Sequence, residues 1–306
     1  MRTFAWVLPL MGWVMAPLLG GIINRVKARF AGRKGQPLLQ GYYDLLKLLR
    51  KGAVYSRSAS GVLRAAPAVI LAALLLATTL IPWGGLAAPL AFGGDFVLLA
   101  YLLGLARFAM VLAALDTGSS FEGMGASREV QFGALAEPTL LLGMVLLAVQ
   151  SGRAGLSEIA AGIDPAAWRS APAILFLLVC AWMVLLLAEN ARIPVDDPNT
   201  HLELTMIHEV MILDHSGPDL GILMYAAALK LWLFSTLLAN LVIPMRPAEA
   251  WLQVVLIAAG TLGMAVVVGV VESVMARLRL VQVPKLLIGA GVLVATALIM
   301  QLIGSR

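Results

Sequence analysis

The sequence contains eight continuous apolar stretches, each about as long as the hydrocarbon layer of a membrane is thick. They cover roughly residues 4–23, 65–83, 95–115, 134–150, 171–189, 220–243, 251–275 and 285–303. A helix needs about 20 apolar residues to cross a bilayer. The stretches lack the alternation of apolar and polar positions that marks barrel strands. The sequence therefore predicts an all-α membrane protein: a bundle of eight transmembrane helices in a single membrane domain, residues 1–306.

The composition agrees with lipid as the main solvent of the chain. Of its 306 residues, 61% are hydrophobic and 13% are charged, whereas about 25% of the residues in a soluble domain are charged. Cys180 is the single cysteine. One thiolate excludes internal disulfides, and it excludes an iron–sulfur cluster or a zinc site built from the chain's own cysteines.

The basic residues predict the orientation of the bundle. Of the 22 lysines and arginines, 15 fall in four connections, at about 24–64, 116–133, 190–219 and 276–285. The connections on the opposite side and the two ends carry five. Short loops rich in Lys and Arg stay in the cytoplasm. We therefore expect a multi-pass protein of the cytoplasmic (inner) membrane, with the four basic connections in the cytoplasm and both termini outside.

The first connection contains an amphipathic stretch, "LLQGYYDLLKLLRK", which predicts a cytoplasmic surface helix. At 100° per residue, one face is polar and carries Gln40, Asp44, Lys47 and Lys51. The other face is apolar and carries Leu38, Tyr42, Leu45, Leu46 and Leu49. Such a helix can lie on the membrane as a lipid anchor, which the composition favours. Alternatively, its Asp44–Lys47 pair belongs to a docking face.

Five ionisable residues stand out within or near the ends of the apolar stretches. They are Arg107, Glu137, Glu189, Lys230 and Glu272. Charges at membrane depth are rare and usually functional. Each also has a structural interpretation: the arginine and lysine can pair with neighbouring carboxylates, and a glutamate can reach the interface or begin a helix. Five in one bundle indicate a connected polar path.

The segment after the fifth stretch, "LLLAENARIPVDDPNTHLELTMIHEV", concentrates charge at one end of the bundle. Its charged residues are Glu189, Arg192, Asp196, Asp197, Glu203, His208 and Glu209. Asp197 before Pro198, or Thr200 with Glu203, predicts a helix start. On that helix Glu203 falls within an apolar arc, where burial would raise its proton affinity; the alternative is a capping role. His201 and His208 share the opposite face, and we expect them to face solvent.

The segment after the fifth apolar stretch and three other segments resemble a known family of membrane proteins. The segment "AENARIPVDDPNTHLELTMIHEVMILDHSG" resembles the signature loop of respiratory complex I subunit 1. It resembles in particular that subunit's counterpart in membrane-bound nickel–iron hydrogenases, formate hydrogenlyase subunit 4 and hydrogenase-4 component C. Three further segments agree: the surface helix, "GASREVQFGALAEPT" with Arg128 and Glu137, and "ESVMARLRLVQVPK" with Arg277 and Arg279. The likeness covers nearly the whole chain in order.

Departures from complex I favour the hydrogenase branch. Asn199 and His201 stand where complex I has acids in the loop. Val195 replaces an aromatic residue, and Ala136 replaces the tyrosine beside the intramembrane glutamate. These changes weaken the case for a quinone headgroup site. In hydrogenases the electrons end on protons, so no quinone need bind.

The resemblance implies a subunit that anchors a soluble redox arm and couples it to proton or sodium movement. The expected partners are the hydrogenase large and small (iron–sulfur) subunits on the cytoplasmic side, antiporter-like membrane subunits and the lipid bilayer, with no nucleic acid. The [NiFe] centre and the iron–sulfur clusters are expected in those partners, and no cofactor in this chain. The alternatives are the quinone-site subunit of a complex I-type NADH dehydrogenase, a purely structural anchor, and a stand-alone transporter, for which inverted repeats are missing.

The predicted site residues form two sets, with no catalytic residue and no metal ligand. The ion path comprises Glu137, Glu189, Glu203, Lys230, Arg107 and Glu272. The mouth and docking surface comprise Gln40, Asp44, Lys47, Lys51, Arg128, Arg192, Asp196, Asp197, His208, Glu209, Arg277 and Arg279.

Overall fold

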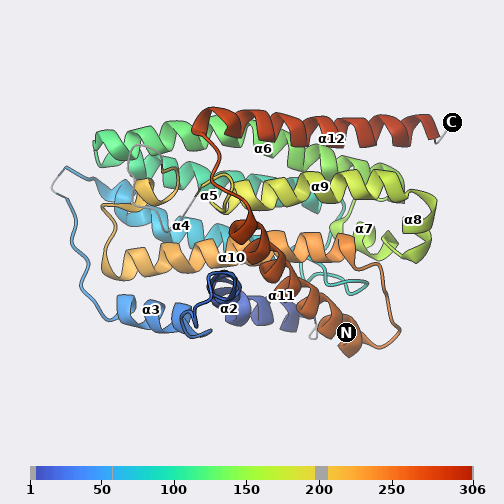
Figure 1. The fold of residues 1–306 in the computed structure, drawn as a ribbon, viewed down its shortest axis with the longest axis horizontal. Coiled ribbons are helices and arrows are strands. Elements are labelled where there is room, and N and C mark those ends of the chain that lie inside the picture. Colours follow the sequence, from blue (N-terminus) through green and yellow to red (C-terminus); the bar gives the residue numbers. More distant parts are fainter. Residues whose placement is uncertain (1–4, 57, 197–205, 305–306) are drawn as a thin grey trace.

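The computed structural model describes residues 5–56, 58–196 and 206–304 as a helical bundle (Figure 1). Within these ranges eight helices are long and apolar enough to cross a membrane. They are α2 (Val7–Phe30), α4 (Gly61–Thr78), α5 (Asp95–Asp116), α6 (Ser120–Ser151), α9 (Pro172–Glu189), α10 (Gly217–Val242), α11 (Ala250–Val274) and α12 (Val283–Gly304). The shorter elements are α3 (Gln40–Leu49), α7 (Leu156–Gly162), α8 (Pro165–Ser170), η1 (Glu209–Ile212) and η2 (Leu280–Gln282). The predicted all-α membrane fold is confirmed.

Helix α10 forms the centre of the bundle, and α12 lies at its edge. α10 packs against α2, α3, α4, α9 and α11, and 67% of its most apolar window is buried, against 22% for the last span. Figure 1 places α12 along one edge and α2 with α3 near the other, while α11 crosses the bundle obliquely. A span with so little buried surface presents most of its apolar residues to lipid or to another subunit.

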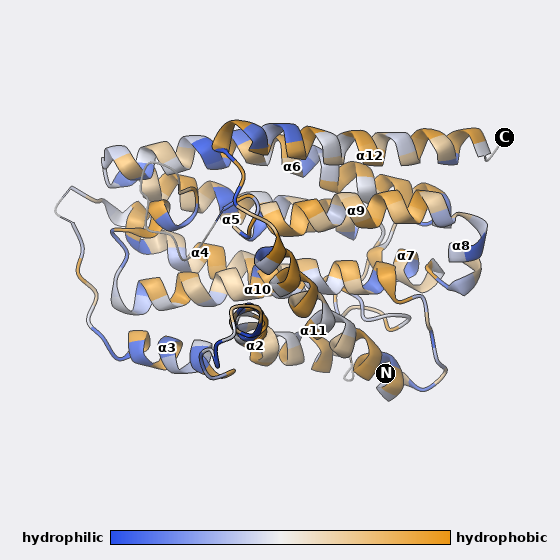
Figure 2. Cartoon of the chain, in the orientation of Figure 1, coloured by the Kyte–Doolittle hydropathy of each residue, from blue (hydrophilic) through white to orange (hydrophobic). Residues whose placement is uncertain are grey.

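The outer surface of the bundle is apolar along the spans. Large exposed side chains there include Val14, Tyr101, Phe108, Phe176 and Ile303. Figure 2 shows hydrophobic residues along the helices, with hydrophilic ones gathered mainly at helix ends and in connections. An apolar surface this extensive is what a lipid-embedded protein requires.

Helix α6 differs from its prediction. The sequence predicted a connection over 116–133 and a span over 134–150, but α6 begins at Ser120 and runs for 32 residues, about 48 Å. Glu137 therefore lies inside the helix, with Pro138 after it, and not at a helix start. Gly125 in the early part of this helix serves for close packing, since an added Cβ there would lie 2.3 Å from Val210.

Two further boundaries differ. Helix α2 continues to Phe30, because a helix end need not coincide with the end of an apolar run, and cations in its last turn are favoured by the helix dipole. The helix expected around 197–211 is not formed where the structure describes it, since 206–208 is non-helical and 209–212 is a 3₁₀ turn. The predicted caps Asp197, Pro198, Thr200 and Glu203 lie outside the described residues.

The surface helix forms as α3, and its apolar residues face two ways. On one side, the Tyr42 hydroxyl donates to the Val14 carbonyl of α2 at 2.5 Å, and Leu48 packs near Gly221 of α10. On the other side, Tyr43 and Leu46 are more than half exposed. α3 is thus fixed to the bundle while presenting an apolar outer face.

Candidate functional site

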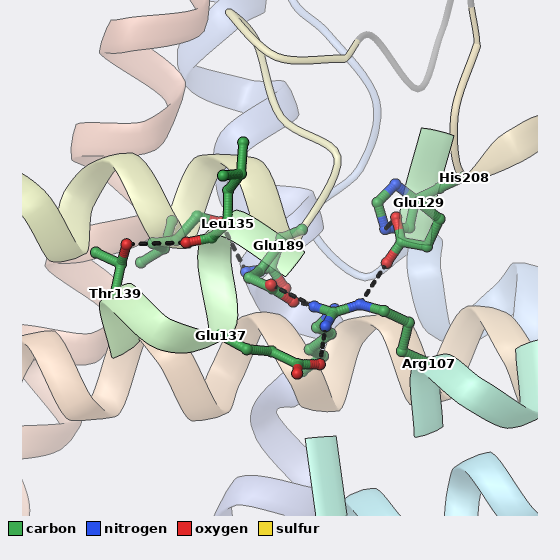
Figure 3. A network of polar contacts seen from close by, with 10 residues as sticks. Arg107, Glu129, Leu135, Glu137, Thr139, Glu189 and His208 are labelled. Atoms are coloured by element: carbon green, nitrogen blue, oxygen red, sulfur yellow. Dashed lines mark hydrogen bonds and ion pairs between the residues drawn. The ribbon is translucent and has the colours of Figure 1, made fainter. Parts of the chain in front are cut away.

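Arg107 of α5 holds three carboxylates inside the membrane-spanning region (Figure 3). Its side chain is 8% exposed. The guanidinium donates from Nε to Glu129 of α6 at 3.0 Å, from Nη1 to Glu137 of α6 and from Nη2 to Glu189 at the end of α9. The planar guanidinium, with donors in a fixed fork, suits this task better than a point charge. One side chain therefore ties three helices together.

Lys230 and His208 complete this set, which we call the Arg107 network (Arg107, Glu129, Glu137, Glu189, Lys230 and His208). The Lys230 ammonium nitrogen lies 2.7 Å from Glu189 Oε2. His208 Nε2 lies 3.3 Å from Glu129 Oε2. Three carboxylates face two permanent cations, so the network carries one excess negative charge while His208 is neutral. A single added proton balances it.

A glycine makes room for the guanidinium. At Gly133 an added Cβ would lie 2.7 Å from Arg107 Nη1. Real Cβ atoms do not approach so closely, so the guanidinium rests on the bare backbone of α6. Gly104 of α5 similarly lies beside Glu137, with Oε1 3.6 Å from where its Cβ would be. Small residues on both helices thus define where the charges meet.

A cavity of about 10 Å³ adjoins the network. It is lined by Arg107, Glu129, Phe132, Gly133, Ala136, Ala188, Glu189, Val195, Ile207, His208 and Leu287. That volume suits about one water molecule. Glu129, Glu189 and His208 all line the cavity, so a water there would lie beside all three. The cavity therefore offers a place for a water molecule between these three side chains.

Glu137 differs from the other two carboxylates in its exposure. Its side chain is 43% exposed, whereas those of Glu129 and Glu189 are 8% and 7% exposed. It lies by Gly104, and the neighbouring α5 residues Tyr101 and Phe108 are exposed too. The network thus has one end open to the side of the bundle and another at His208.

We call the end of the bundle formed by residues 190–196 and 206–216 the mouth. There Asp196 accepts hydrogen bonds from the backbone N–H groups of Ile207 and His208 at 3.0 and 3.4 Å. It also pairs with Arg277 at 2.8 Å. Arg128 donates to the Met206 carbonyl at 2.8 Å. These contacts fix the backbone that carries His208 towards Glu129.

Glu272 lies in a separate ion cluster. Its side chain is fully buried, with Lys27 at 2.7 Å and Arg192 at 3.5 Å. Among the described residues no ion pair joins this cluster to the Arg107 network. Glu272 therefore links α2 and α11 to the segment after α9, and the sequence-based grouping with Glu137 and Glu189 is not reproduced.

The remaining predicted residues lie on the surface or outside the described ranges. Gln40 donates to Asp44 at 2.8 Å, while Lys47, Lys51 and Arg279 are exposed. Glu209 begins η1. Asp197 and Glu203 lie outside the described residues.

Sequence reasoning missed Glu129 and misplaced His208. Glu129 was assigned to a connection because the fourth span was started too late. The uninterrupted run from Ala126 to Ala136 was the available signal, since it contains one glycine and no proline. His208 was expected to face solvent, yet its side chain is 28% exposed and turns to Glu129.

One family model and two individual proteins match most of this sequence. The sequence model of the NADH dehydrogenase family matches residues 2–303. Formate hydrogenlyase subunit 4 of Escherichia coli (strain K12) is 32% identical over 289 residues, 90% of each chain. Hydrogenase-4 component C of the same organism is 32% identical over 237 residues, 77% of this chain and 73% of that one.

A solved structure shares the fold. A chain of the membrane-bound sulfane sulfur reductase, an archaeal respiratory membrane complex, superposes with a TM-score of 0.82. The match covers 97% of this chain and 98% of the other at 21% sequence identity. At that identity the likeness concerns the arrangement of the helices.

Proposed function

Because the chain belongs to the NADH dehydrogenase family, of the complex I subunit 1 type, we propose that it is the anchoring and ion-coupling subunit of a membrane-bound [NiFe] hydrogenase. The complex is of the formate hydrogenlyase type. Two relatives at 32% identity carry the names of hydrogenase components, which supports this branch over a quinone-reducing one. The coupled ion is the proton.

The observation that carries the proposal is the Arg107 network. Its charge balance depends on one proton, and it extends from the mouth at His208 to the side of the bundle at Glu137. Charges in a low-dielectric interior interact strongly. A change of charge or position at His208 therefore alters the proton affinity of Glu129, and Arg107 transmits the change to Glu189 and Glu137.

In this mechanism the soluble arm acts on the mouth. The [NiFe] centre and the iron–sulfur clusters belong to the hydrogenase large and small subunits, which dock on the cytoplasmic side. Turnover there shifts the segment that carries His208. Glu129 then takes up or releases a proton, with the water-sized cavity as the bridge. The proton leaves through Glu137.

The exposure of Glu137 supports a position for the membrane partner in this proposal. A carboxylate that is 43% exposed is costly against hydrocarbon. An antiporter-like subunit that packs over Glu137, Tyr101 and Phe108 removes this cost and receives the proton. The bilayer covers the remaining apolar sides, including the outer face of α12.

The test uses the assembled complex in sealed vesicles, with hydrogen output and pH change recorded together. Glu129→Gln and Glu189→Gln keep the size of the side chain while removing its charge. We expect hydrogen evolution that is impaired or no longer coupled to a pH change, with assembly intact. Glu158→Gln, at an exposed carboxylate of α7, is the control and should behave as wild type.

Other outcomes favour the alternatives. Full turnover with a full pH change in both network variants would mean that these charges have only a structural role. Loss of assembly in both variants would mean the same. A requirement for added quinone in electron flow favours the complex I-type role.

A further inference from the structure

A second group of buried titratable side chains lies at the mouth, apart from the Arg107 network. Glu122 in the first turn of α6 is 1% exposed. Its Oε1 accepts a hydrogen bond from the backbone N–H of Asp214 at 3.0 Å. Its Oε2 is buried and has no hydrogen-bond partner within the described residues. In that part of the chain no cation pairs with Glu122, so a charge on it would be expensive.

His215 follows Asp214 directly and is 5% exposed. Neither ring nitrogen has a hydrogen-bond partner within the described residues. Burial lowers the pKa of His215, and this effect outweighs the opposite influence of Asp219 and Asp214. The ring is therefore neutral near pH 7 and can accept a proton. The preceding residue, Asp214, is hydrogen-bonded to Glu122 through its backbone N–H.

Residues 52–56 cover this group on the solvent side. Val54 donates its N–H to Ser216 Oγ at 2.9 Å, and that hydroxyl donates to the Val54 carbonyl at 3.1 Å. The Tyr55 hydroxyl bonds to Asp219, which raises the pKa of Tyr55. Asp219 Oδ2 is buried without a partner in the described part. Val54 itself is 75% exposed, so only a thin cover separates these groups from water.

A thin apolar layer separates Glu122 from the Arg107 network. Glu122 and Glu129 are seven residues apart on α6, so they share a face at a spacing of about 10 Å. Ala126 lies between them, 1% exposed, and packs with Val210 and Met211 of η1. The layer also contains Val111, Ala114 and Met206. Tightly packed apolar volumes stay dry, so no proton crosses while it is closed.

We propose that Glu122 and His215 form a proton-uptake site on the mouth side of this layer, and that displacement of η1 admits water and lets the site load Glu129. The inference rests on the proposed function. η1 is suited to this task because His208 precedes it and Asp214 and His215 follow it closely in the chain. Any shift of His208 at Glu129 moves Val210 and Met211.

The proton balance is simple. A proton from bulk water enters at His215, passes to Glu122 and then through water in the opened layer to Glu129, and His215 is reloaded from bulk. Glu129 gains the proton that neutralises the excess charge of the network. No electron moves and no other bond changes.

The test opens the layer artificially. The assembled complex in sealed vesicles, without substrate, receives a step in external pH, and an enclosed dye reports the internal pH. Val210→Ser places a hydroxyl in the layer, and we expect a several-fold faster collapse of the gradient. Adding Glu122→Gln should return the rate to the wild-type value. Val130→Ser, at an exposed valine of α6 outside the layer, is the matched control for Val210→Ser and should not leak.

Two results overturn the inference. One is a leak in Val210→Ser that Glu122→Gln leaves unchanged. The other is no leak in an assembled Val210→Ser complex. If that variant does not assemble, Met211→Ser serves in the same design. A normal pH change during turnover with Glu122→Gln, alongside a lost one with Glu129→Gln, contradicts the uptake site and leaves the proposed function standing.

Discussion

At the scale of single residues, the site depends on a glycine as much as on its charged side chains. Gly133 lets Arg107 lie against the backbone of α6, and that position puts Glu129, Glu137 and Glu189 within reach of one guanidinium. A guanidinium displaced by one methyl group would leave at least one buried carboxylate without its cation. Removing one partner of a buried ion pair typically costs about 3–5 kcal/mol.

Gly133→Ala adds a single methyl group, yet it should clearly impair the coupling between hydrogen evolution and the pH change. Overpacking of a tight site costs about 1–3 kcal/mol, and we expect a lower melting temperature together with a reduced pH change per hydrogen evolved. Gly263→Ala in α11 is the matched control, because an added Cβ there meets nothing within 4 Å. Gly263→Ala should be neutral or stabilising by up to about 1 kcal/mol. Equal behaviour of the two variants would contradict the role assigned to Gly133.

His215 should make stability depend on pH in a defined direction. Burial lowers its pKa in the folded protein below the ordinary value of about 6.5. Between those two values the unfolded chain binds more protons, so the free energy of unfolding rises with pH and is highest above about 6.5. The melting temperature should fall as the pH drops through this window. His215→Gln should flatten that fall, and an unchanged profile would mean that the ring is not shielded from water.

At the scale of elements, α6 contributes most to the site. It carries Glu122, Glu129 and Glu137 on one continuous helix of 32 residues, and it packs against α5, α9, α12 and η1. The second element of consequence is α3, which packs inward through Tyr42 and Leu48 and leaves its polar residues available to a partner.

Replacing Asp44 and Lys47 together by Ala should release the soluble arm from the membrane while this subunit still inserts. The reason is that these side chains lie on the polar face of α3 and Lys47 is exposed. Hydrogenase activity in washed membranes, compared with the level of this subunit, measures the effect. Tyr43→Ala with Leu46→Ala, on the apolar outer face, is the control for lipid anchoring. Full retention of the arm in the polar variant would leave α3 as a lipid anchor.

At the scale of the whole molecule, the sequence predicted the fold well and the site in part. Eight spans follow from apolar length alone, and the family follows from the loop after α9. Arg107, Glu189 and Lys230 were singled out because charges within apolar runs are rare. Their mutual contacts were not predictable, since Arg107 and Glu189 are 82 positions apart and meet only through helix packing. Glu129 was missed because the fourth span was predicted to begin only at about residue 134, whereas α6 begins at Ser120.

The orientation of the bundle is testable by labelling. After Cys180→Ala, single cysteines at Ala31→Cys and Ala161→Cys should react with an impermeant maleimide from opposite sides. Both positions are exposed alanines, so reactivity reports the side of the membrane. The excess of basic residues predicts cytoplasmic labelling at 31 and external labelling at 161. Reversed labelling would move the mouth to the wrong side for a cytoplasmic arm.

The half-exposed Glu137 has a consequence for the life of the protein before assembly. A copy that has inserted alone presents this carboxylate to lipid acyl chains, and among the described residues its ion pair is with Arg107. An unassembled subunit therefore carries a polar defect on its lipid-facing surface. The carboxylate has either to draw water into the bilayer or to give up its ion pair. Membrane proteases that survey polar defects within the bilayer would find it there. On the proposed function, docking of a neighbour over Glu137 covers this carboxylate, so an assembled copy no longer exposes it to the bilayer.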